Sequence, residues 1–101
     1  MSERRGTRRF SLRLPVAVML PDHFGPINAE TKDVSARGVY FYVPDPVEEG
    51  SSLEFLLTLP PEITLTDSIQ VRCRGRAIRV ESDEPGKTGV AAIIDDYQFL
   101  A

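Results

Sequence analysis

The 101-residue sequence predicts an all-β fold, a small antiparallel β-barrel of six strands. Two observations lead to this prediction. Apolar and polar residues alternate in short runs, and a period of two is typical of half-buried strands. Turn-forming residues such as Pro, Gly and Asp separate these runs at regular intervals, a spacing typical of small barrels. An apolar content of 42% and a charged content of 27% suit one globular domain of modest size.

The first three strands are expected in residues 10–20, 27–34 and 39–43. Every second residue from Phe10 to Leu20 is apolar, which places these side chains on one face of a strand. Pro15 cannot donate to a ladder, so we expect an edge or a bulge there. A short link ending at Gly38 joins the second and third strands. A glycine at this position suits a positive φ angle or the close approach of a ligand.

The last three strands follow the same reasoning. Alternation over residues 53–59 predicts a fourth strand, which stops at Pro60 and Pro61. In the fifth, the apolar phase moves at Gly75 to Ile78 and Val80, which predicts a β-bulge. Cys73 falls on the apolar side of that strand, and a lone cysteine excludes a disulfide within the chain.

The sixth strand is expected over residues 89–94. It is apolar on both faces, so we expect it to be covered on both. Asp95 and Asp96 can cap a helix beginning at Tyr97, since aspartate accepts from free amides at a helix start. The predicted fold therefore has at most a short helical turn at its C-terminal end.

The net charge of −3 is unevenly distributed. Residues 1–13 hold five arginines and one glutamate, a charge of +4, while the remainder carries −7. We expect residues 1–9 to form a flexible basic arm and residues 10–101 to form a single barrel domain. Positive charge confined to an arm suits a small anion better than a long nucleic acid, which calls for a basic face on the domain.

Several classes of function lack support in the sequence. We find no nucleophile–base arrangement, no metal-ligand spacing and no glycine-rich phosphate loop, so we expect neither an enzyme nor a metal or cofactor site. No run approaches the roughly 20 apolar residues of a membrane-spanning helix. Thr7 to Arg13 resembles a twin-arginine export signal, but the apolar run behind it is short and contains Pro15. We therefore expect a cytoplasmic protein.

Two motifs stand in the same order as in a known family. Arg5 and Arg9 form an R-x-x-x-R pattern, and Asp33, Ser35 and Gly38 form a D-x-S-x-x-G pattern, with 23 residues between the two motifs. Together with the strand pattern, they resemble the PilZ domain family of bacterial cyclic di-GMP receptors. The resemblance extends over nearly the whole chain, and it implies a PilZ-type six-stranded barrel.

The resemblance also implies roles for individual residues. Arg5 and Arg9 are expected to bind phosphates and guanine edges, which suits the planar donor fork of arginine. Asp33 is expected to accept from the N1–H and N2–H₂ donors of a guanine, with Ser35 and Gly38 beside it. An arginine at the place of Arg4 implies a stacked, intercalated pair of cyclic di-GMP molecules. Further candidate contacts are Arg8, Arg74 and Arg79.

Other interpretations remain open at this point. Asp33 and Ser35 also fit a turn capped by its own side chains, and Arg8 fits a solvated charge. For the whole protein we expect a cyclic di-GMP receptor that signals to an unidentified downstream protein. The alternative is a PilZ-like interaction module that binds no nucleotide. A nucleic-acid-binding barrel using Phe10 or Tyr40 is disfavoured by the acidic body of the chain.

Overall fold

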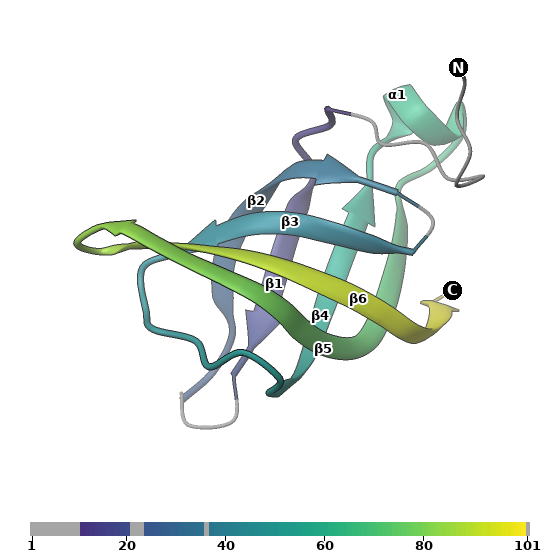
Figure 1. Ribbon diagram of the computed structural model, residues 1–101. Coiled ribbons are helices and arrows are strands. Elements are labelled where there is room, and N and C mark those ends of the chain that lie inside the picture. The colour runs from purple at the N-terminus through teal and green to yellow at the C-terminus, as the bar shows by residue number, and fades with distance from the viewer. Residues whose placement is uncertain (1–10, 21–23, 36, 101) are drawn as a thin grey trace, which may run out of the picture.

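The six expected strands close into an antiparallel barrel in the computed structural model, which describes residues 11–20, 24–35 and 37–100 (Figure 1). The strands are β1 (Pro15–Met19), β2 (Ile27–Val34), β3 (Gly38–Val43), β4 (Ser52–Leu59), β5 (Ile69–Glu84) and β6 (Lys87–Leu100). Their order around the barrel is β1-β2-β3-β6-β5-β4, and β4 pairs back onto β1. The predicted fold class is therefore confirmed. The expected arm, with Arg4, Arg5, Arg8 and Arg9, lies outside the described residues.

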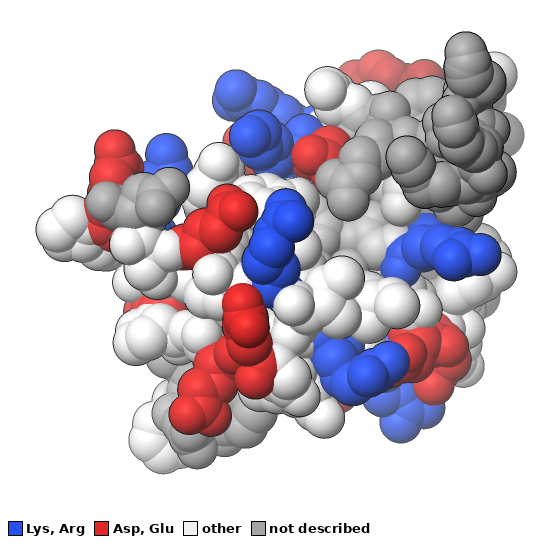
Figure 2. All heavy atoms as spheres, in the orientation of Figure 1, with Lys and Arg blue, Asp and Glu red and all other residues white. Residues whose placement is uncertain are grey.

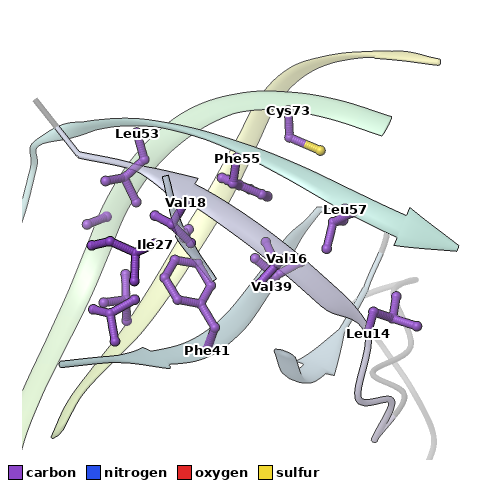
Figure 3. Packing of buried hydrophobic residues seen from close by; sticks show 14 of the residues in the cluster. Leu14, Val16, Val18, Ile27, Val39, Phe41, Leu53, Phe55, Leu57 and Cys73 are labelled. Atoms are coloured by element: carbon purple, nitrogen blue, oxygen red, sulfur yellow. The ribbon is translucent and has the colours of Figure 1, made fainter. Parts of the chain in front are cut away.

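The alternating apolar residues fill the interior of the barrel. Val16 and Val18 of β1 point inward with the aromatic rings of β3 and β4 (Figure 3). The side chains of Phe41 and Phe55 are fully buried, with ring centroids 6.0 Å apart. These buried residues come from strands that are distant in sequence. Burying them together requires the barrel to close, and closure of the barrel in turn keeps them away from water.

The first strand is shorter than expected, because the ladder begins at Pro15 rather than at Phe10, which lies outside the described residues. Leu12 and Leu14 keep the inward phase, and Leu14 is buried in the core. The strand β1 is not an edge strand, since it pairs with β2 on one side and β4 on the other, but Pro15 itself pairs only with Glu30 of β2. Proline is tolerated because it is the first residue of the strand.

The long strands β5 and β6 are bent by irregular pairing. Their register shifts between Arg74 and Gly75, where the extra residue is Asp95 of β6, so the phase of β5 does not change at Gly75, contrary to the prediction. A β-carbon on Gly75 would overlap the backbone of β6 at the Ile93 carbonyl, so the two strands can approach only with glycine here. A second shift beside Ile78 leaves that side chain 57% exposed. The expected inward position of Ile78 is therefore wrong, and the inward phase resumes at Val80.

The C-terminal segment is strand, not helix. β6 continues to Leu100, and Asp96, Tyr97 and Phe99 pair with Arg74, Cys73 and Val71 of β5. The expected helical turn at Tyr97 is wrong because the first half of β5 offers these residues a backbone partner. The structure also contains a short helix that the sequence did not predict, α1 (Pro61–Thr64), with a proline at its first turn.

The coverage expected for β6 is confirmed in its first half. Residues 88–92 are buried on both faces. On the outer face, the ring of Tyr40 lies over Gly89, where a β-carbon would overlap its hydroxyl. The hydroxyl of Tyr40 donates to Oε1 of Glu81 at 2.6 Å. Burial and this hydrogen bond raise the pKa of Tyr40 well above its usual value.

Candidate functional site

The link between β2 and β3 is a tight turn organised by Ser35. The Ser35 N–H donates to the Gly38 carbonyl at 2.9 Å. Its hydroxyl oxygen accepts from the N–H groups of Arg37 and Gly38, each at 3.3 Å. The side-chain-capped turn that the sequence left open is therefore present at Ser35. Ser35 therefore stabilises the backbone conformation of the D-x-S-x-x-G segment.

Gly38 is required by the barrel itself. It pairs with Ile93 of β6, and a β-carbon on it would overlap the carbonyl oxygen of Ala92. Its φ is not among the positive values, so the expectation of a left-handed glycine is wrong. The Ile94 N–H donates to the Arg37 carbonyl at 2.7 Å. These contacts fix the turn against β6.

Asp33 lies on the outer face of the barrel, on the strand that leads into the turn. The register of β2 against β3 shifts between Thr31, which points inward, and Asp33, which pairs with Tyr40. The row through Asp33 continues to Tyr40, then to Ala91 of β6 and Arg79 of β5. Since directly opposed residues point to the same face, Asp33 and Arg79 share one side of the sheet.

Thr31 ties the segment that follows the arginine cluster to β2. Its hydroxyl accepts from the Leu14 N–H at 2.9 Å and donates to the Leu12 carbonyl at 2.6 Å. Its own N–H donates to the Leu14 carbonyl at 3.0 Å. Leu12 is three residues after Arg9 in sequence, a span of about 11 Å at full extension. Leu12 and Leu14 are therefore held beside Thr31 of β2, which is two residues before Asp33 in sequence.

A groove of about 570 Å³ lies on the outer face next to this anchor. Arg13, Lys32 and Lys87 line it together with Tyr42, and Glu30 supplies a carboxylate. The Lys87 ammonium lies 4.5 Å from the centroid of the Tyr42 ring. Arg13 and Lys32 lie close to the anchor, whereas Lys87 lies at the far end of β3 from the turn and is paired with Glu84 at 3.9 Å. Sequence reasoning did not single out these cations. They come from three separate segments of the chain, so no local sequence pattern indicates the groove.

The two arginines expected from β5 are held by neighbouring carboxylates. Nε of Arg74 lies 3.5 Å from Oδ1 of Asp96, and Nε of Arg79 lies 3.5 Å from Oε2 of Glu81. Arg79 shares the row of Asp33, but Arg74 is paired beyond the end of β3. The structure thus brings Asp33, Ser35 and Gly38 together on one hairpin and leaves Arg74 and Arg79 two strands away.

Arg76 is a further outer-face arginine that the sequence did not highlight. It pairs with Ile93, the partner of Gly38, and it is therefore nearer the turn than Arg74. Its guanidinium donates to both carboxylate oxygens of Asp95 at 3.0 and 3.1 Å, which lowers the pKa of Asp95. Figure 2 shows positive and negative side chains interspersed on this face, so it presents no continuous basic surface.

Nowhere in the described ranges do three or more His, Cys, Asp or Glu side chains gather as a metal site would require. The part of the chain that the structure describes also contains no helix with the length and apolarity that crossing a membrane demands.

Comparisons with known proteins agree with the fold and with the family that the sequence resembles. The solved structure of the Bacillus subtilis inhibitor of motility (MotI/DgrA) is similar, with a TM-score of 0.77 and 20% sequence identity over 96% of this chain. This chain spans 45% of the length of that structure, and the likeness concerns the fold. No curated protein matches the sequence. Residues 3–97 match the PilZ domain, a span that includes both motifs, the first five strands and β6 as far as Tyr97. The chain therefore belongs to the PilZ domain family.

Proposed function

We propose that this protein is a cyclic di-GMP receptor that acts as an adaptor in the cytoplasm. The proposal depends chiefly on the Thr31 anchor. Its hydrogen bonds hold Leu12 and Leu14 next to β2, close to Asp33. The arginine motif ends three residues before Leu12, so it is tethered near Asp33. Two motifs separated in sequence can then contact one compact anion.

The ligand is recognised by complementary chemistry on the two segments. Arg5 and Arg9 donate to the phosphates and to the O6/N7 edge of guanine, where charge-assisted bidentate bonds are strongest. Asp33 accepts from the guanine N1–H and N2–H₂ groups. Ser35 and Gly38 hold the turn in a shape that lets the base approach. Arg13 and Lys32, which line the groove beside the Thr31 anchor, favour a dianionic ligand near Asp33.

Further arginines extend this site. Arg4 stacks with a second nucleotide, so that an intercalated pair of cyclic di-GMP molecules binds to one chain. Arg8 adds a phosphate contact. Arg79 reaches the ligand along the row of Asp33 after exchanging its partner Glu81, whereas Arg74 makes at most a peripheral contact.

The signal is a change of surface rather than a reaction. Ligand bridges the arginine segment and the turn, and the bridge alters charge and shape at one end of the barrel. A downstream protein that contacts this end then distinguishes the liganded from the free receptor. PilZ domains are binding modules, and this mechanism needs no catalytic group.

Calorimetric titration of the intact chain with cyclic di-GMP tests the site assignment. Arg5→Ala and Arg9→Ala are each expected to abolish measurable binding, because each removes charge-assisted bonds to the ligand. Arg72→Ala is the matched control, since Arg72 faces Glu54 of β4 on the other side of β5. If both arm variants bind like the control, the assignment is wrong and the alternative of a module that binds no nucleotide through this motif gains support.

A second titration tests how the base is identified. Asp33→Ala is expected to weaken cyclic di-GMP binding by about 1–3 kcal/mol, the usual worth of a good base-edge contact. Cyclic di-AMP is expected to bind poorly to the wild type, because adenine lacks the N1–H donor and the O6 acceptor. Equal affinity for the two dinucleotides would mean that phosphates alone are recognised. The same titrations give the stoichiometry, which Arg4→Leu is expected to reduce from two nucleotides to one.

A further inference from the structure

The second half of β6 forms an edge that the other strands do not cover. Pairing between β3 and β6 ends at Gly38 and Ile93, and the last backbone contact is from Ile94 to Arg37. From Asp96 to Leu100, β6 pairs with β5 alone among the described residues. Figure 1 shows this part of β6 running past the end of β3 that carries the turn. No other strand among the described residues pairs with its outer N–H and C=O groups, as is typical of a sheet edge that can accept a further strand.

Two aromatic side chains on this edge have an unusual exposure. Tyr97 and Phe99 are opposite Cys73 and Val71, which are 1% and 8% exposed and point into the barrel. Tyr97 and Phe99 share that inward phase, yet they are 59% and 61% exposed. Their rings pack edge to face at 5.7 Å. An apolar pair next to an unpaired edge is the combination that an added β-strand can cover.

We propose that the strand that covers this edge is β6 of a second copy, paired antiparallel about Gln98. This register places Gln98 opposite itself, Tyr97 opposite Phe99, and Asp96 opposite Leu100. All four aromatic rings then lie on one face as two cross-strand pairs, an arrangement that stabilises antiparallel sheets. The proposal concerns self-association and does not depend on nucleotide binding.

Charge favours this register and this partner. The two Asp96 carboxylates are four residues apart along the paired strands, about 13–14 Å, which exceeds the screening length of about 8 Å at physiological salt. Each also has its own cation, since Arg74 lies 3.5 Å away in the same chain. A register centred on Asp96 would instead place two carboxylates face to face. A different partner strand would need apolar side chains opposite Tyr97 and Phe99 and no acidic residue opposite Asp96. A second copy of this edge meets both conditions.

The interface is small, so the dimer is weak. Five paired residues and four rings bury less than the roughly 1,200 Å² of a stable interface. We therefore expect association at high protein concentration, with the barrel itself unchanged.

Cysteine cross-linking tests the register. In Gln98→Cys the two new residues are directly opposed, with α-carbons about 4.5–5.5 Å apart, within the range of a disulfide. Asp96→Cys is the matched control, because its two copies are too far apart to join. Mild oxidation is expected to convert Gln98→Cys to a covalent dimer at least tenfold faster than Asp96→Cys. A mixture of Asp96→Cys and Leu100→Cys is expected to give the mixed dimer. The wild-type protein shows how much cross-linking comes from Cys73, the buried native cysteine that every variant also contains.

Sedimentation equilibrium provides an independent measurement. The wild type is expected to show concentration-dependent dimer, and Tyr97→Lys combined with Phe99→Lys is expected to remain monomeric with a cooperative thermal melt. Equal cross-linking rates at positions 98 and 96, or a wild type that stays monomeric at the highest concentration, would overturn the proposal. The same holds if the double lysine variant dimerises like wild type.

Discussion

Replacing Thr31 with valine removes the hydroxyl that joins β2 to the segment following the arginine cluster, and it keeps the shape of the side chain. Thr31 is 2% exposed, so water cannot replace the lost bonds without opening the barrel. The Leu14 N–H loses its acceptor and the Leu12 carbonyl loses its donor.

The cost can be worked from these two bonds. A buried N–H left without an acceptor destabilises by about 1–3 kcal/mol, and the partly buried bond to Leu12 adds about 0.5–1.5 kcal/mol. We expect the free energy of unfolding to fall by about 2–4 kcal/mol. For a domain of this size, 1 kcal/mol shifts the melting temperature by roughly 4–8 °C, so the melting temperature should fall by roughly 10–25 °C.

Urea unfolding monitored by circular dichroism measures this change, with Thr31→Ser as the matched control that retains the hydroxyl. Hydrogen exchange at the Leu14 amide should be slow in the wild type and in Thr31→Ser, and fast in Thr31→Val. Cyclic di-GMP binding, measured where the variant is still folded, should weaken in Thr31→Val alone. If Thr31→Val unfolds at the same urea concentration as Thr31→Ser, the hydroxyl does not anchor this segment and the reasoning fails.

Two further predictions concern the barrel. Gly38→Ala should lower the free energy of unfolding by about 1–3 kcal/mol without any ligand, because its methyl group would overlap the Ala92 carbonyl; urea midpoints equal to wild type would contradict this. Burial raises the pKa of Cys73 from about 9 to about 11, so the unfolded thiol loses its proton first. Stability from this group is fully present below pH 9 and is lost as pH rises toward 11. Thermal melts from pH 8 to 11 should therefore show a steeper decline in wild type than in Cys73→Ala, and parallel curves would refute the assignment.

Much of the fold could be predicted because alternation reports which face of a strand is buried. The runs ending at Leu20 and Leu59 predicted inward faces that the structure confirms, as did the position of Cys73. The six-stranded barrel followed from counting such runs. Alternation is local, however, and it says nothing about which strand lies beside which. That is why the end of β6 was mistaken for a helical turn: its partner, residues 70–74 of β5, is more than 20 residues away in sequence.

The candidate site divides in the same way. The sequence by itself determined the two motifs, their order and the chemistry of their side chains, since these are properties of residue type and spacing. The tertiary structure decided that Ser35 caps its own turn, and that Gly38 is glycine because the backbone of β6 lies against it. It also decided that a buried hydroxyl at Thr31 brings the chain beside Asp33, through hydrogen bonds spanning 17 and 19 residues. The Ser35 cap is a local contact that the sequence had left open as one alternative. The contacts of Gly38 and Thr31 depend on closure of the barrel, because each joins segments whose proximity no local pattern encodes.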